Sequence, residues 1–140
     1  MSQYISLNMS SFDEYRSLIG AAYEAKQNSY SPYSKFAVGA AVLCEDETIF
    51  TGCNIENASY GLTNCAERVA IQSAVATGHQ TFQAIAIVGD SKGPCMPCGA
   101  CRQVLVEFKV PLIILEQSET ELVVYELAEL LPQSFSADNL

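Results

Sequence analysis

Hydrophobic residues recur at helical spacing near the start of the chain, and a polar cap accompanies them. The tetrapeptide Ser11-Phe12-Asp13-Glu14 has the form of a capping box, in which two side chains satisfy free backbone amides at a helix start. The apolar positions on one face of a 3.6-residue period are Phe12, Tyr15, Leu18, Ile19 and Ala22. The pattern predicts a first helix from about Ser11 to Asn28, before the turn-rich segment 29–34.

Five short apolar runs are typical of strands. Their bounds are Phe36 to Cys44, Ile49 to Asn54, Phe82 to Gly89, Pro111 to Glu116 and Leu122 to Tyr125. The segment Glu45 to Thr48 can turn the chain between the first two runs, which predicts a hairpin. Residues 84–88 are apolar throughout, so we expect the third strand to be buried on both faces.

Two further helices are predicted to begin at cysteines. One runs from about Cys65 to Thr77, with Asn64 as its N-cap and Gly78 at its end. The other runs from Cys98 to Phe108, and a helical turn over Glu126 to Leu131 stops before a proline. Strands that alternate with helices after a hairpin predict an α/β fold with helices packed on a sheet. The length of 140 residues suits one domain, 1–140.

The composition argues against several classes of function. The formal net charge of −9, from 16 acidic and 7 basic residues, disfavours binding a nucleic acid by its phosphates. No apolar run approaches the roughly 20 residues of a membrane span, and no signal-peptide pattern opens the chain. We therefore expect a cytoplasmic protein without a membrane partner, whose six cysteines are reduced.

Two short stretches carry the candidate chemistry, Asn64-Cys65-Ala66-Glu67 and Pro97-Cys98-Gly99-Ala100-Cys101-Arg102. Cys98 and Cys101, three residues apart, share one helical face, and a helix N-terminus favours thiolate over thiol. Three cysteine ligands leave a tetrahedral zinc ion one open position, which is the arrangement of a catalytic site. Glu67 could move protons beside that metal. The alternative is that Glu67 only stabilises the helix N-terminus through the helix dipole.

Together the two stretches resemble the zinc deaminases of nucleobases, which carry a ligand-x-Glu pair followed by Pro-Cys-x-x-Cys. Segments 31–41, 51–61, 98–103 and 130–135 look like those of the small cytidine deaminases, so the resemblance runs from about Ser11 to Phe135. It implies a five-stranded mixed sheet with helices on both faces. Tyr60 and Phe135 match positions that complete a neighbouring subunit's site, which implies a homotetramer.

The resemblance also implies the reaction. One zinc ion per chain would be bound by three cysteines, Cys65, Cys98 and Cys101. Glu67 would shuttle protons from the attacking water to N3 of a cytosine ring and to the leaving amine. Arg68 would withdraw charge from a ligand sulfur by hydrogen bonding to it, with Arg102 as the alternative partner. Cytidine and 2′-deoxycytidine would become uridine and 2′-deoxyuridine with release of ammonia, in pyrimidine nucleoside salvage.

Substrate recognition is expected from several segments. Asn54 and Glu56, two residues apart at a strand end, can point to one side and bracket a ribose hydroxyl. A plain polar loop is the alternative interpretation of these residues. The resemblance implies contact with the 3′-hydroxyl, packing of Phe36 against the pyrimidine, and recognition of the base edge by the backbone at Ala66.

Three rival functions stay open. Cys95-Met96-Pro97-Cys98 is itself a C-x-x-C, so Cys95 could close a four-cysteine structural zinc site or form a redox pair. A polynucleotide deaminase of the same superfamily would need basic and aromatic surface, which this acidic, tryptophan-free chain lacks. The third is a nucleoside-analogue deaminase, such as one acting on blasticidin S. The run Asn54-Ile55-Glu56-Asn57 favours plain cytidine and deoxycytidine instead.

Overall fold

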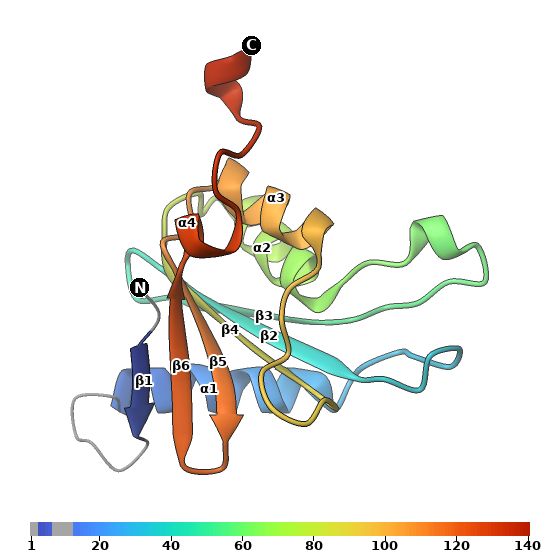
Figure 1. The fold of residues 1–140 in the computed structure, drawn as a ribbon. Helices are drawn as coiled ribbons and strands as arrows, with labels where there is room; N and C mark the ends of the chain where they lie inside the picture. The colour runs from blue at the N-terminus through green and yellow to red at the C-terminus, as the bar shows by residue number, and fades with distance from the viewer. Residues whose placement is uncertain (1–2, 7–12) are drawn as a thin grey trace.

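The structure is a computed structural model that describes residues 3–6 and 13–140 (Figure 1). Its helices are α1 (Asp13–Lys26), α2 (Ala66–Ala76), α3 (Gly99–Glu107) and α4 (Leu127–Leu130), with short 3-10 turns at Tyr60–Leu62 and Ala137–Asn139. All four helical segments predicted from the sequence are present. The expected capping residue of the first helix, Ser11, lies outside the described residues.

One mixed sheet forms the centre of the fold. Its strands, in spatial order, are β1 (Gln3–Ser6), β6 (Glu121–Glu126), β5 (Leu112–Ser118), β4 (Phe82–Gly89), β2 (Val38–Cys44) and β3 (Ile49–Cys53). Strands β4 and β5 are parallel, and the other neighbours are antiparallel. The five predicted strands are confirmed. The edge strand β1 is an addition, because four residues carry too little alternation to identify a strand from sequence.

Helices cover both faces of the sheet, as expected. Along β4, Ala84, Ala86 and Val88 pack with α1, whereas Ile85 and Ile87 face α2 and α3. All five of these residues are at most 2% exposed, which confirms that β4 is buried on both sides. Figure 1 shows α1 on one side of the sheet and α2 with α3 on the other. Within the described ranges, no helix is both long and apolar enough to cross a membrane.

The starts of α2 and α3 determine where the functional side chains lie. Cys65 and Cys98, with extended backbone angles, are the N-cap residues of these helices. The prediction that Asn64 caps α2 is therefore wrong by one position. The Asn64 side chain donates instead to Gln72 Oε1 at 3.0 Å, and its backbone pairs with Ile55. Gly78, with a φ of +99°, ends α2 as predicted.

Candidate metal centre and substrate cavity

The three candidate ligands meet at the N-termini of two neighbouring helices. Cys65 precedes α2, Cys98 precedes α3, and Cys101 lies in the first turn of α3. Their Sγ atoms all lie within 4.8 Å of one another, and those of Cys98 and Cys101 are 3.5 Å apart. In the described part of the chain, these side chains form the group of His, Cys, Asp or Glu residues that could hold a metal ion.

The spacing of the sulfur atoms fits zinc. Zinc binds thiolate at about 2.3 Å in a tetrahedron, so two ligand sulfurs lie roughly 3.8 Å apart. The separation of 3.5 Å and the upper bound of 4.8 Å lie on either side of that value. Free backbone N–H groups at the two helix starts also favour thiolate, the form that binds the metal. Cys95 does not belong to the group, so a zinc ion held by the three sulfurs would keep one ligand position free.

Hydrogen bonds distribute the charge of the sulfur cluster. Bonds from the Cys101 thiol and the Arg68 guanidinium lower the pKa of Cys65 to about 5. The same contact raises the pKa of Cys101, because its proton is shared with the Cys65 thiolate. Arg68 Nη2 donates to Cys65 Sγ at 3.2 Å. The arginine therefore contacts a candidate ligand sulfur, where it can withdraw part of the negative charge.

Glu67 lies beside the cluster and out of bulk water. It is in the first turn of α2, two residues after Cys65, and is only 5% exposed. Burial raises the pKa of the Glu67 carboxyl, and the neighbouring Cys65 thiolate raises it further. A carboxyl whose pKa is raised is a stronger base when it is ionised, so it can take a proton from water and deliver it to a bound base.

A cavity of about 220 Å³ opens at the cluster. Several residues expected at the site line it together: Phe36, Asn54, Cys65, Ala66, Glu67 and Cys98. Its remaining wall includes Cys95 and Met96, which come from the loop before α3. The cavity wall therefore combines two of the three grouped cysteines, the buried carboxyl and an aromatic ring.

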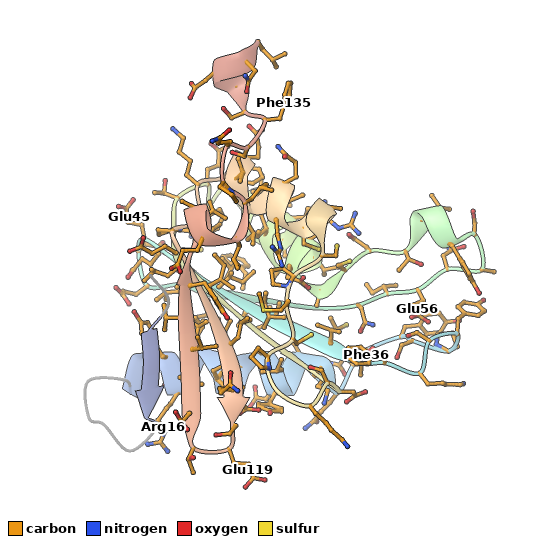
Figure 2. All side chains as sticks on the ribbon, in the orientation of Figure 1. Arg16, Phe36, Glu45, Glu56, Glu119 and Phe135 are labelled. Carbon is orange, nitrogen blue, oxygen red and sulfur yellow. The ribbon has the colours of Figure 1, made fainter. Side chains whose placement is uncertain are left out.

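Asn54 and Glu56 lie in adjoining cavities. Asn54 lines the cavity beside the cluster, whereas Glu56 lines a second one, of about 360 Å³, with Tyr33 and Tyr60. Thr63 borders both cavities. Figure 2 shows Phe36 near the sheet and Glu56 farther out on the projecting segment. The structure thus places Asn54 in the cavity beside the cluster, as predicted, but it places Glu56 in the adjoining cavity.

The Glu56 carboxylate is already engaged by the segment before β2. It accepts from the backbone amides of Tyr33 and Ser34, at 2.9 and 3.1 Å, and from Ser34 Oγ at 2.5 Å. These bonds lower the pKa of Glu56, so the group stays ionised. Its role in this structure includes holding the 33–34 turn against the loop after β3.

Tyr60 and Phe135 lie outside the cavity that the cluster lines. Tyr60 is 74% exposed and Phe135 is 60% exposed. Figure 2 shows Phe135 on the C-terminal segment, beyond α3. Gln103 Nε2 donates to the Phe135 carbonyl at 2.8 Å, and Arg102 donates to backbone oxygens at 97 and 130. Arg102 therefore joins the start of α3 to the end of α4. The alternative prediction, in which Arg102 hydrogen-bonds to a ligand sulfur, does not match these contacts.

Sequence reasoning missed one residue next to the cavity. Asp90, directly after β4, accepts a hydrogen bond from the Ala37 amide at 2.8 Å and pairs with Lys26 at 2.6 Å. No local motif marks it, because its partners lie 53 and 64 positions away in the chain. A polar residue at the carboxyl end of a buried strand was the available signal.

Comparisons with known proteins agree with this geometry. Residues 13–117 match the family described as the cytidine and deoxycytidylate deaminase zinc-binding region. A curated cytidine deaminase of Sporosarcina psychrophila is 48% identical over 126 residues, which cover 88% of this chain and 92% of the relative.

Solved structures give the same result. The crystal structure of cytidine deaminase from Burkholderia pseudomallei superposes with a TM-score of 0.82 at 48% identity, covering 86% of this chain and 98% of that one. That of Mycobacterium tuberculosis gives a TM-score of 0.76 at 41% identity, with coverages of 87% and 97%. With a family match over most of its length and relatives this similar, the chain belongs to the cytidine and deoxycytidylate deaminase family of zinc-binding hydrolytic enzymes.

Proposed function

We propose that the chain deaminates cytidine and 2′-deoxycytidine to uridine and 2′-deoxyuridine, with consumption of water and release of ammonia, in pyrimidine nucleoside salvage. The observation that carries the proposal is the buried Glu67 beside the grouped sulfurs of Cys65, Cys98 and Cys101. Glu67, Cys65 and Cys98 line one cavity. The relatives named cytidine deaminase support this choice of substrate.

In this proposal Cys65, Cys98 and Cys101 hold one zinc ion per chain. Bound zinc lowers the pKa of a coordinated water towards about 7, which makes hydroxide available at neutral pH. Glu67 takes a proton from the water and passes it to N3 of the cytosine ring, so that C4 becomes electrophilic. The remaining hydroxide oxygen bonds to C4, and the same carboxyl then takes the proton of this new hydroxyl and passes it to the amine nitrogen. The C4–N bond breaks and ammonia leaves. Arg68 moderates the charge of three thiolates through its bond to Cys65 Sγ at 3.2 Å.

The cavity walls orient the nucleoside. Phe36 packs against the pyrimidine, and the backbone at Ala66 reads the base edge; both residues line the cavity with Glu67. Asn54 contacts the ribose 3′-hydroxyl, for which it keeps one N–H of its amide group. Glu56 contacts the same hydroxyl from the adjoining cavity, and this contact requires its carboxylate to turn past Thr63, which borders both cavities.

The working form of the enzyme in this proposal is a cytoplasmic homotetramer. Tyr60 and Phe135 are large aromatic side chains that are 74% and 60% exposed on a single chain. Tyrosine and phenylalanine side chains are enriched at surfaces that another subunit covers. Each would complete the site of a neighbouring subunit. The six cysteines are all free thiols, which suits a reducing compartment.

The test follows the ultraviolet band of cytosine as purified protein converts cytidine, alongside the zinc content per chain. We expect turnover with one zinc per chain. Glu67→Gln should keep zinc and fold but lose most turnover, because the ligands remain while the proton shuttle is gone. Glu107→Gln, an exposed carboxylate near the end of α3, is the matched control and should behave as wild type.

Other outcomes would redirect the assignment. Near-normal turnover of Glu67→Gln would remove that residue from its role. Zinc without turnover on either nucleoside would favour an analogue deaminase. Loss of zinc on replacing Cys95 by serine would favour a closed structural site, contrary to the grouping of the other three sulfurs.

A further inference from the structure

The backbone of residues 36–38, which carries Phe36 into the cavity, is hydrogen-bonded at every polar group. The Phe36 amide donates to Ser34 Oγ at 3.0 Å, and its carbonyl accepts from Asn54 Nδ2 at 2.8 Å. The Val38 amide donates to Asn54 Oδ1 at 3.0 Å, and its carbonyl accepts from the Asn54 amide at 3.2 Å. Asn54 therefore holds the two ends of this short segment from one side.

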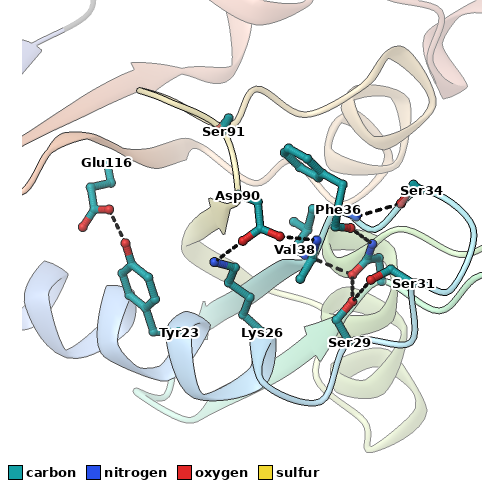
Figure 3. A network of polar contacts seen from close by, with 12 residues as sticks. Tyr23, Lys26, Ser29, Ser31, Ser34, Phe36, Val38, Asp90, Ser91 and Glu116 are labelled. Atoms are coloured by element: carbon teal, nitrogen blue, oxygen red, sulfur yellow. Dashed lines mark hydrogen bonds and ion pairs between the residues drawn. The ribbon is translucent and has the colours of Figure 1, made fainter.

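The middle residue of the segment is held from the opposite side by Asp90. The Ala37 amide donates to Asp90 Oδ2 at 2.8 Å, and the Ala37 carbonyl accepts from the Asp90 amide at 3.2 Å. Asp90 Oδ1 pairs with Lys26 Nζ at 2.6 Å. Figure 3 shows Asp90 between Lys26 and the segment that carries Phe36 and Val38. One carboxylate thus links the last turn of α1 to the cavity wall.

The end of β4 also lies against the Phe36 ring itself. Gly89, the residue before Asp90, packs directly against the ring: a Cβ built at Gly89 would lie 3.2 Å from Phe36 Cε1 and 2.6 Å from Cys95 Sγ. Phe36 and Cys95 both line the cavity. The end of β4 therefore supports the ring with Gly89 and fixes its backbone with Asp90.

We propose that Asp90, braced by Lys26, is a positioning residue that holds Ala37 so that the Phe36 ring keeps its place in the substrate cavity. This inference rests on the proposed function, because it takes the cavity to be the nucleoside site. Asp90 itself does not line the cavity, and no sulfur atom or Glu67 is among its hydrogen-bond or ion-pair partners. It acts on the substrate through Phe36.

This placement predicts which kinetic constant changes. Packing of a ring against the pyrimidine is the same before and during the reaction, so it contributes to binding in both states. Loosening the ring should therefore raise KM and leave kcat nearly unchanged. A defect of the metal centre would lower kcat instead.

Three variants separate the two contacts of Asp90. Asp90→Ala removes both, and KM for cytidine should rise about tenfold, which corresponds to about 1.4 kcal/mol. Asp90→Asn keeps an oxygen that can accept from the Ala37 amide but loses the charge. Lys26→Met keeps the Asp90 carboxylate and removes its ion pair. The last two should each raise KM by less than Asp90→Ala, with kcat within about threefold of wild type.

The matched control is Asp46→Ala. Asp46 also joins a backbone amide to a basic side chain, with the Thr48 amide at 3.0 Å and His79 Nε2 at 3.0 Å, but it lies in the β2–β3 turn. Its loss should leave KM unchanged. Equal KM in Asp90→Ala and wild type, or a fall in kcat alone, would overturn the positioning role.

Hydrogen–deuterium exchange of the Ala37 amide tests its hydrogen bond to Asp90 by a measurement that does not depend on turnover. Exchange should be faster in Asp90→Ala, and unaltered exchange would overturn the inference even if cytidine is not a substrate. Absence of wild-type turnover would instead count against the proposed function. If Asp90→Ala does not fold, the Asp90→Asn and Lys26→Met values decide: unchanged KM and exchange in both would overturn the inference.

Discussion

Gly52 of β3 permits α2, which carries Glu67, to lie directly on the sheet. A Cβ built at Gly52 would lie 2.5 Å from the Ala70 amide nitrogen and 2.6 Å from the Ala66 carbonyl oxygen. Ordinary contact begins at 3.4 Å, so Gly52→Ala must push the helix backbone by about 0.9 Å, the difference between 3.4 and 2.5 Å. Overpacking of this kind costs about 1–3 kcal/mol. For a domain of this size, that lowers the melting temperature by about 4–12 °C.

The displacement should also reach the metal centre. Ala66 lies between Cys65 and Glu67, so a shift at its carbonyl moves the first turn of α2 relative to Cys98 and Cys101. Misplacement by about 1 Å can reduce turnover about 100-fold. We expect Gly52→Ala to bind zinc more weakly and to turn over cytidine far more slowly.

Thermal unfolding, zinc competition against a chelator and turnover measure these effects. Gly20→Ala is the control, because Gly20 is exposed within α1 and a Cβ there would have no atom within 4 Å. That substitution should raise stability by about 0.5–1 kcal/mol, since alanine is the better helix former. If Gly52→Ala has the melting temperature and the turnover of the wild type, the close approach of α2 to β3 does not determine the position of the helix that carries Glu67. That result would refute the reasoning.

Three further predictions concern other parts of the molecule. Arg68→Gln should reduce zinc affinity or turnover about 10–100-fold, because the charge on Cys65 is no longer shared; unchanged values in chelator competition and kinetics would contradict this. Phe135→Ala should raise KM or dissociate the proposed tetramer, as light scattering would detect, and a variant unaltered in both respects would remove Phe135 from a shared site. Bonds to Lys26 and the Ala37 amide hold the pKa of Asp90 below its usual range. The difference in melting temperature between wild type and Asp90→Ala should therefore be constant above about pH 5 and shrink as the pH falls through the lowered pKa; a difference that grows in acid would contradict the sign.

Local sequence features predicted most of the fold. Apolar runs identified the five strands, and residues 84–88 of β4 are apolar throughout because that strand is buried on both faces. The placement of helices on both faces of the sheet was implied by the family resemblance. The metal-binding group could also be predicted from the sequence. Cys98 and Cys101 are fixed by one helical turn, and only their meeting with Cys65 required the tertiary fold.

Features that depend on distant contacts were not predicted from the sequence. The N-cap of α2 is Cys65 and not Asn64, because backbone pairing with Ile55 and a bond to Gln72 engage the asparagine. Propensity alone could not include those partners. Glu56 was expected beside Asn54, yet the 33–34 turn draws its carboxylate into the adjoining cavity.

The contacts of Gly52 and Asp90 act on the same cavity by different routes, and a double variant can tell whether those routes are independent. Gly52 spaces α2 from the sheet, whereas Asp90 fixes the segment before β2, and the two residues share no hydrogen-bond partner. Independent sites should give additive free energies within about 0.5 kcal/mol, so the changes in kcat/KM of Gly52→Ala and Asp90→Ala should multiply. Strand β2 connects them, since it pairs with Gly52 through Ala40 and begins at Val38, next to the Ala37 that Asp90 contacts. A coupling energy well above 0.5 kcal/mol would mean that β2 moves as one rigid unit and that the metal side and the ring side of the cavity are positioned together.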